Sequence, residues 1–257
     1  MVGTVQRPDE SSRISWAVEL ICLVSAGALF IADALRLWMS VGLRWWTPIV
    51  VVTAGLTADL VSGIVHWTAD TWGSDDMPVI GRRFLRPFRV HHVDPDDFLR
   101  RSFVDCNGDV AMLTLPILIA AFLVPLTTPL AAIGATALVA FAGWALPTNQ
   151  VHQWAHMPSP PRIVRWLQLC GLVLSPPAHR RHHVSPYAMN YCIATGWCND
   201  VLNLAGFFPR LERVVTRLTG VVPRADEQEF AARGQRSVTS VSVSAGEARG
   251  VRAPRTN

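Results

Sequence analysis

Four apolar segments constrain the fold of this chain more than any other feature. They cover about residues 14–39, 48–65, 110–126 and 129–146. A helix that crosses the hydrocarbon core of a bilayer needs roughly 20 mostly apolar residues, so the last two segments are short and require tilted helices. The chain is 50% hydrophobic and 16% charged, whereas soluble domains are about 25% charged. We therefore predict an all-α integral membrane protein with about four transmembrane helices, and a re-entrant hairpin over 110–146 is the alternative.

The segments between and around these apolar runs define the rest of the predicted domain. Residues 163–174 are apolar but number only about a dozen, so we expect them to lie in the membrane interface. We expect the polar residues 1–13 to be disordered, as well as the Arg-rich, non-periodic tail 224–257. The predicted folded domain is thus 14–223. Its first apolar run contains charged residues and no clear cleavage site, which indicates a retained span rather than a signal peptide.

The distribution of arginine predicts the orientation in the membrane. Six arginines lie between the second and third apolar segments, whereas the turn at 127–128 carries no charge. Since cytoplasmic loops are enriched in basic residues, we expect this loop and both termini to be cytoplasmic. All 23 basic residues are arginine, a coding bias that favours a bacterial inner membrane over the endoplasmic reticulum. The net charge of +4 suits anionic lipid head groups, and no nucleic-acid-binding motif accompanies it.

Eight histidines form the second constraining feature, because all of them lie in short clusters beside apolar segments. They are His66, His91, His92, His152, His156, His179, His182 and His183. On a helix, positions i, i+3 and i+4 share one face, so the last three converge, as do His152 and His156. The predicted topology places every cluster on the cytoplasmic side. Imidazole nitrogens suit iron, zinc, copper or nickel, so one or two first-row metal ions are expected.

The kind of metal protein follows from what the other classes require. Structural zinc uses four ligands and often cysteine, but the five cysteines here lack CxxC spacing and are expected to be free thiols. A transporter would place its ligands within the spans, and a haem protein would leave most of the histidines unexplained. A di-iron oxygenase or desaturase that attacks a lipid C–H bond fits best.

Two aspartates near the second apolar segment have open roles. Asp59 lies two helical turns before His66, and it either orients a ligand or satisfies a neighbouring helix. Asp70 lies four residues after His66. It either binds the metal as a further ligand or orients the His66 imidazole without touching the metal.

Six sequence blocks resemble the plasmanylethanolamine desaturase family, the Kua or CarF type of membrane desaturase with histidine boxes. The resemblance covers about residues 50–212, and its blocks are 63–74 (GIVHWTADTWGS), 86–95 (RPFRVHHVDP), 107–109 (NGD), 149–156 (NQVHQWAH), 179–186 (HRRHHVSP) and 195–199 (TGWCN). Such enzymes form the vinyl-ether double bond of plasmalogens from 1-O-alkyl (plasmanyl) phospholipids. The resemblance implies O2 as co-substrate, two iron ions, and an external electron donor that is cytochrome b5-like or ferredoxin-like.

The resemblance also implies roles for particular residues. The eight histidines match the metal ligands of the family and would form a cytoplasmic di-iron cap. Four further residues are candidates for support around the ligands, namely Asp70, Asp94, Asn149 and Asn199. Three of them have a structural alternative, because Asp70 can cap a helix, Asp94 can form a turn with Pro95, and Asn199 can satisfy backbone groups.

Three other functions remain open from the sequence. An acyl-lipid desaturase or a hydroxylase of the same class would use the same ligand set on a different bond or with a different product. A membrane metal-binding scaffold would bind metal without turnover. The blocks at 69–74 and 86–95 favour the plasmanyl branch.

Overall fold

The computed structural model describes residues 13–74, 77–78, 80–184, 187–221 and 223. These residues form helices and connecting segments with no strand. Four helices are long and apolar enough to cross a membrane, namely α1 (Arg13–Ser40), α2 (Thr47–Thr71), α5 (Phe103–Leu123) and α6 (Pro129–Ala145), the last counted together with the short helix that continues it. The predicted all-helical membrane fold is confirmed. The predicted disorder at residues 1–13 and 224–257 lies outside the described residues except at Arg13, where the prediction is wrong because Arg13 is the first residue of α1.

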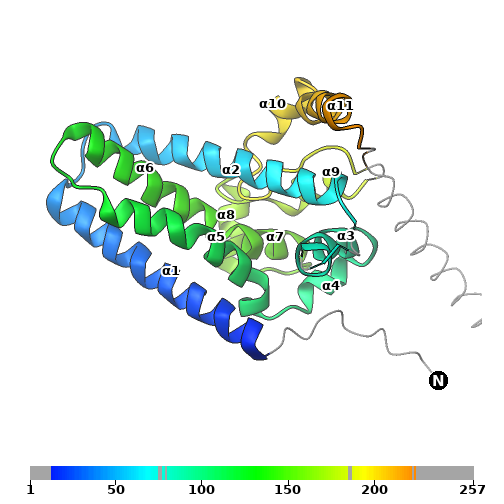
Figure 1. Ribbon diagram of the computed structural model, residues 1–257, viewed down its shortest axis with the longest axis horizontal. Helices are drawn as coiled ribbons and strands as arrows, with labels where there is room; N and C mark the ends of the chain where they lie inside the picture. The colour runs from blue at the N-terminus through cyan, green and yellow to red at the C-terminus, as the bar shows by residue number, and fades with distance from the viewer. Residues whose placement is uncertain (1–12, 75–76, 79, 185–186, 222, 224–257) are drawn as a thin grey trace, which may run out of the picture.

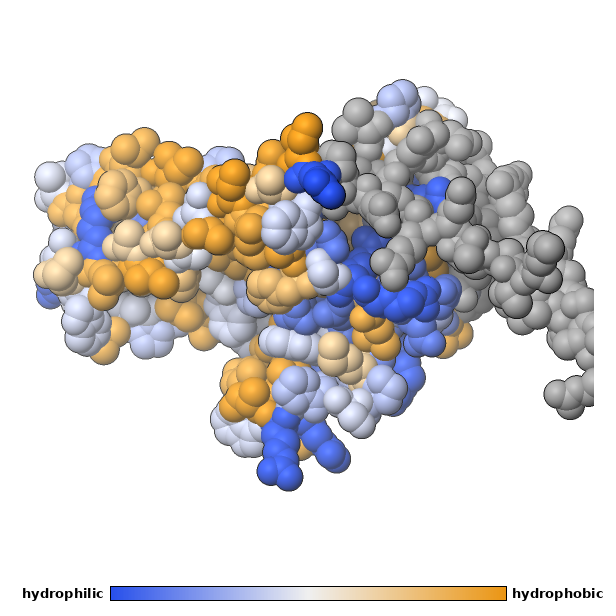
Figure 2. All heavy atoms as spheres, turned by 90° about the horizontal axis from the view of Figure 1, so that it is seen from below, coloured by the Kyte–Doolittle hydropathy of each residue, from blue (hydrophilic) through white to orange (hydrophobic). Residues whose placement is uncertain are grey.

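The four long helices lie side by side and form an elongated bundle (Figure 1). Helix α5 packs against α1 and α6, and α6 also packs against α2. Small side chains let the helices approach closely at the centre, where Ala26, Ala111 and Ala142 surround Leu118. Figure 2 shows hydrophobic side chains over most of the bundle and hydrophilic ones gathered near one end. This distribution fits a multi-pass membrane protein with a polar cap.

The cap consists of short elements at one end of the bundle (Figure 1). They are η1 (Gly81–Leu85), α3 (Arg86–Val93), α4 (Pro95–Leu99), α7 (Thr148–His156), α8 (Arg162–Leu169), α9 (Pro176–His182), α10 (Asn199–Leu204) and α11 (Phe207–Thr219). Helix α8 occupies part of the predicted interfacial segment and exposes an apolar face of Ile163, Trp166 and Leu169. That face has the character expected of a helix in the membrane interface.

Two long helices extend further towards the cap than the apolar runs predict. Helix α2 continues six residues past Val65 and ends at Thr71, since no helix breaker precedes Gly73, which has a φ of +78°. Helix α5 begins at Phe103 instead of residue 110, because the Ser102 hydroxyl accepts the backbone N–H of Asp105 and caps it. Hydrophobicity marks the hydrocarbon core, whereas capping residues mark the helix ends. The extra turns of α2 carry His66 and Asp70 into the cap.

Asp59 holds the chain between α9 and α10 against α2. Its carboxylate is fully buried and accepts backbone N–H groups from Thr195 at 2.8 Å, Gly196 at 2.9 Å and Cys198 at 2.9 Å. The sequence left two roles open for Asp59, namely orienting a metal ligand or hydrogen bonding to a neighbouring helix. Neither role describes this arrangement. Asp59 instead satisfies an irregular segment of the cap, whose backbone donors would otherwise be buried without partners.

Gly63 allows this part of the cap to touch α2. A Cβ atom at Gly63 would lie 2.5 Å from the Sγ atom and 3.3 Å from the Cα atom of Cys192. We expect Gly63→Ala to destabilise the protein by about 1–3 kcal/mol through overpacking, which a lower thermal unfolding midpoint in detergent would reveal. Gly134→Ala is the matched control, because a Cβ atom there would meet nothing within 4 Å. Equal unfolding midpoints for the two variants would refute the close approach.

Candidate functional site

All eight predicted histidines meet in one cluster inside the cap. His66 comes from α2, His91 and His92 from α3, two from α7, and the last three from α9 and the residue after it. His179 and His182 lie on α9, whose N-cap is Ser175, and the Ser175 hydroxyl accepts the backbone N–H of Ala178. His183 is the residue that ends this helix, so the predicted helical spacing holds for the first two of these three histidines. Segments more than a hundred residues apart in the chain thus contribute to one site.

The ring nitrogens form two groups whose members lie within 4.8 Å of one another. The first group, which we call group A, consists of His91, His152, His156, His179 and His183. The second group, group B, consists of His66, His91, His92 and His182. His91 belongs to both groups, so the two groups are adjacent and share one side chain.

Group A is arranged around the Nε2 atom of His179. This atom lies 2.9 Å from the Nε2 atoms of His152, His156 and His183. Nitrogen ligands about 2.1 Å from a single metal ion lie roughly 3 Å apart in tetrahedral or octahedral geometry. The spacing within group A is therefore that of donors around one ion.

Group B surrounds the carboxylate of Asp70. The Oδ2 atom of Asp70 lies 3.2 Å from Nε2 of His66, 3.3 Å from Nε2 of His182 and 3.5 Å from Nε2 of His92. The side chains of Asp70 and His66 are fully buried. The carboxylate therefore lies on the same side of the imidazoles as the converging nitrogens, not behind the rings.

Backbone carbonyls fix which nitrogen of three rings carries the hydrogen. The Nδ1 atom of His66 lies 3.1 Å from the carbonyl oxygen of Tyr191, and that of His182 lies 2.8 Å from the carbonyl oxygen of Met189. The Nδ1 atom of His91 lies 3.4 Å from the carbonyl oxygen of Pro87. A carbonyl only accepts, so each Nδ1 donates, and in the neutral ring each Nε2 holds a lone pair.

Burial favours the neutral form of several of these histidines. Burial lowers the pKa of His92 to about 3, although the nearby Asp70 carboxylate opposes the shift. Burial also lowers the pKa of His179 and of His182, and neighbouring imidazoles lower both further. Neutral imidazole is the form that binds metal, so no proton has to be displaced from these rings when a metal binds.

The site as folded has unmet polar groups that a metal ion would satisfy. Among the described residues, Nε2 of His66, Nε2 of His91 and both carboxylate oxygens of Asp70 are buried without a hydrogen-bond partner. With the hydrogen on Nδ1, the Nε2 lone pairs of His66 and His182 would face the Asp70 carboxylate at 3.2 and 3.3 Å, an arrangement that is unfavourable in a buried site. A cation between them removes the repulsion. The donor set therefore fits a two-metal centre with one ion per group.

The other three candidates for support around the ligands have different surroundings. Asp94 is about half exposed, and its carboxylate accepts a hydrogen bond from Arg100 at 2.6 Å. Asn199 binds the backbone N–H and carbonyl of Cys192, both at 2.9 Å, which is the backbone role that the sequence left open. The amide of Asn149 donates to the carbonyl of Cys106 at 2.9 Å. These three side chains therefore bind other groups, whereas backbone carbonyls contact the Nδ1 atoms of His66, His91 and His182.

Sequence reasoning missed several groups that orient the histidines. The ring of Tyr187 stacks on His92 with centroids 4.7 Å apart and planes 7° apart, and Tyr187 adopts a φ of +58°. The carbonyl oxygens that hold His66 and His182 belong to Tyr191 and Met189. Backbone carbonyls carry no sequence signal, and a tyrosine after a histidine box is not distinctive, so only the fold reveals these contacts.

Comparison with known proteins places the chain among lipid desaturases. The model of the lipid desaturase domain matches residues 55–226. "Plasmanylethanolamine desaturase" of Myxococcus xanthus is 44% identical over 212 residues, 82% of this chain and 75% of the relative. "Plasmanylethanolamine desaturase 1" of Mus musculus is 42% identical over 204 residues, 73% of each chain. "Fatty acid desaturase 4, chloroplastic" of Arabidopsis thaliana is 35% identical over 176 residues, 66% of this chain and 52% of the relative.

Comparison with solved structures gives no significant match. The sequence relatives nevertheless confirm the resemblance that the histidine blocks indicated. In this chain, four apolar helices carry the histidine cluster at one end. The chain belongs to the lipid desaturase family.

Proposed function

We propose that this protein desaturates the ether-linked alkyl chain of 1-O-alkyl phospholipids and so forms the vinyl ether of plasmalogens. The relatives named plasmanylethanolamine desaturase support this substrate, because they are 42–44% identical and match most of the chain. The observation that carries the chemistry is the convergence of eight histidines, six of them buried, in two groups that share His91. In balance, the alkyl chain loses two hydrogens, and O2 with two electrons and two protons becomes two waters.

We propose that the eight histidines hold two iron ions, with one ion in each group. Bound iron would supply the O2 activation that cleavage of an unactivated C–H bond requires. The Nε2 atoms of His66 and His182 are available to bind metal, because backbone carbonyl groups accept hydrogen bonds from the Nδ1 atoms of these rings. Asp70 faces the same point as these nitrogens, so we assign it to group B as an oxygen ligand rather than as a support behind a ring. Iron accepts this combination of imidazole and carboxylate.

The protein's own side chains would position the lipid and exclude water. A cavity reaches His91 and His152 and is lined on the bundle side by Val65, Val110 and Leu113. Phe98 packs against His152 with ring centroids 4.8 Å apart, which limits access of water to group A. We propose that the alkyl chain enters from the bilayer, and that the cap faces the cytoplasm, where a small external redox protein delivers the electrons.

An acyl-lipid desaturase is the second candidate function. The relative named fatty acid desaturase 4 supports it, with 35% identity to this chain. The plasmanyl lipid remains the first candidate because those relatives are more similar and match a larger share of both chains.

Expression in a host that lacks ether-lipid desaturation tests the proposal. Cells fed a 1-O-alkylglycerol are expected to accumulate acid-labile vinyl ethers, which mass spectrometry detects, when they make the wild-type protein. His183→Ala is expected to abolish the product, because group A loses a ligand. Cys198→Ala is the control and is expected to keep most activity, since the thiol donates to the Leu56 carbonyl at 3.5 Å and Cys198 belongs to neither group A nor group B.

The alternatives give different products in the same experiment. A new acyl double bond without a vinyl ether would show an acyl-lipid desaturase, and an alcohol would show a hydroxylase. If iron-loaded protein with a working reductase formed no product, a membrane metal-binding scaffold would be the remaining alternative. Full activity in His183→Ala membranes would refute the assignment of the site.

A further inference from the structure

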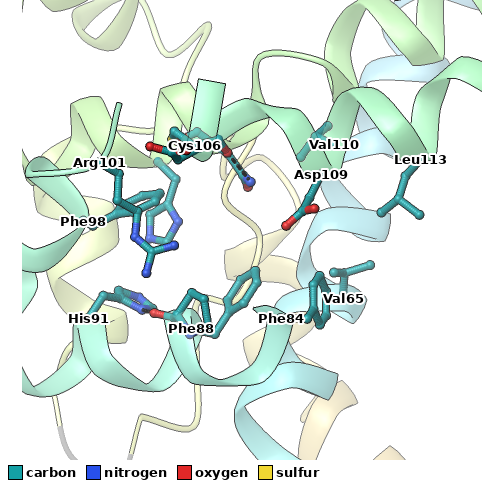
Figure 3. Close-up of a pocket in the computed structure, with 14 residues that line it drawn as sticks. Val65, Phe84, Phe88, His91, Phe98, Arg101, Cys106, Asp109, Val110 and Leu113 are labelled. Carbon is teal, nitrogen blue, oxygen red and sulfur yellow. Dashed lines mark hydrogen bonds between the residues drawn. The ribbon is translucent and has the colours of Figure 1, made fainter. Parts of the chain in front are cut away.

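A cavity connects the histidine cluster to the side of the bundle, between the segment η1–α3 and the start of α5 (Figure 3). His91 and His152 line it next to group A, whereas Val65, Val110 and Leu113 line it further along the bundle. The exposed fraction of Leu113 is 60%, so this part of the wall faces the surroundings of the bundle. The cavity therefore joins an apolar side to the metal ligands.

The polar part of the cavity carries one guanidinium close to the metal ligands. Figure 3 shows the Arg101 side chain pointing into the cavity beside Phe98 and His91. Its charge is partly balanced by Asp97, whose Oδ2 atom accepts a hydrogen bond from Nη2 at 3.3 Å. A guanidinium carries several N–H donors in a planar fork, so the hydrogen bond to Asp97 leaves donors for a ligand.

Arg101 is the positively charged side chain among the residues that line this cavity, and it lies beside His91 of the metal-ligand cluster. A bound anion would offset the repulsion between its charge and metal cations in the neighbouring site. The adjoining residue Arg100 has no such conflict, because it is 59% exposed and pairs with Asp94 and Asp97 on the surface. Arg101 thus has the environment of a residue that binds an anionic group of the substrate.

The proposed reaction fixes what that anion is. In a 1-O-alkyl phospholipid, only the ether oxygen, the glycerol backbone and a phosphoester oxygen separate the reacting alkyl carbon from phosphorus. When that carbon lies at the histidines, the phosphate must lie close by, still within the polar part of the cavity. We propose that Arg101 binds the phosphodiester of the lipid and so sets the carbon that reaches the metal centre. This inference rests on the proposed function.

The charges that α5 contributes to the cavity agree with a phosphoethanolamine head group. Asp105 and Asp109 lie one helical turn apart on α5 and line the same cavity, and Figure 3 shows the Asp109 carboxylate pointing into it. The polar part of the cavity therefore presents a cation and two carboxylates, as a zwitterion with one phosphate and one ammonium requires. A second anionic group on the head group would meet repulsion there.

Lipid binding in the absence of oxygen tests the role of Arg101 without turnover. The probes are a labelled 1-O-alkyl phosphoethanolamine lipid and the neutral diradylglycerol that lacks the phosphoethanolamine group, each titrated into detergent-purified protein of equal iron content. We expect Arg101→Ala to raise the Kd of the phospholipid about 10- to 100-fold, because a charge-assisted contact is lost, and to leave the Kd of the neutral lipid unchanged. Arg101→Lys should restore part of the affinity.

Arg100→Ala is the matched control and should bind both lipids as the wild type does. Two outcomes would overturn the inference: an unchanged phospholipid Kd in Arg101→Ala, or an equal loss for both lipids, which would mean a structural role. Because binding is measured without oxygen, it separates this inference from the proposed function. Wild-type protein that forms no vinyl ether yet shows the Arg101-dependent phosphate preference would refute only the function.

Discussion

Replacing His91 with alanine is expected to remove metal from both halves of the site and to lower turnover by at least about 100-fold. His91 is the one histidine of the described residues that both groups share, and its Nε2 atom is buried without a hydrogen-bond partner. Loss of a group that merely supports a ligand already costs about 10- to 100-fold in metal affinity or activity, so loss of a shared ligand should cost more. Elemental analysis of purified protein would show iron falling well below one ion per chain.

His156→Ala is the matched comparison for this prediction. His156 belongs to group A only, so its loss should leave the ion of group B in place, with about one iron per chain. Turnover should still be lost, because the reaction needs both ions. Equal iron contents in the two variants would contradict the shared position of His91, and retention of two ions in His91→Ala would contradict the ligand assignment.

Asp70→Ala is expected to deplete the ion of group B and to lower turnover about 10- to 100-fold. The carboxylate is fully buried, and its Oδ2 atom lies 3.2–3.5 Å from the Nε2 atoms of His66, His182 and His92. A second effect follows from charge, because the dication of group B loses its neighbouring anion. Asp70→Asn keeps the shape and should retain more iron than Asp70→Ala, with an altered Mössbauer spectrum.

Asp94→Asn is the control for the carboxylate. Asp94 is half exposed and pairs with Arg100, so this variant should keep wild-type iron content and turnover within about twofold, since exposed ion pairs contribute little. The competing explanation for Asp70 is a cap for a helix end. In that case Asp70→Ala would lower the unfolding temperature while iron content stayed at the wild-type level, and that pattern would refute the ligand role.

The sequence predicts the membrane helices and the histidine cluster because both follow from local rules. Apolar length identifies the four long helices, and the i, i+3, i+4 spacing of the α9 histidines identifies a shared helical face. The positions of the helix ends are harder to predict from the sequence. The second apolar segment ends at Val65, after which polar residues begin. Helix α2 nevertheless continues to Thr71, because backbone hydrogen bonding does not depend on hydrophobicity.

The candidates around the ligands were harder to predict, for a physical reason. Asp94 and Asn199 lie beside metal ligands or in family blocks, but their side chains turn to Arg100 and to the Cys192 backbone. The groups that orient His66 and His182 are carbonyl oxygens from the segment before α10. Any residue type supplies a carbonyl, so only the tertiary arrangement shows which one is used.

The iron content of the purified wild-type protein, measured together with vinyl-ether formation by the same sample, tests the central claim most directly. The account predicts about two iron ions per chain, coupled as neighbours in the Mössbauer spectrum, and vinyl-ether formation that falls as the iron is removed by a chelator and returns when iron is restored. Full vinyl-ether formation by protein that holds a single metal ion, or that holds zinc in place of iron, would contradict it.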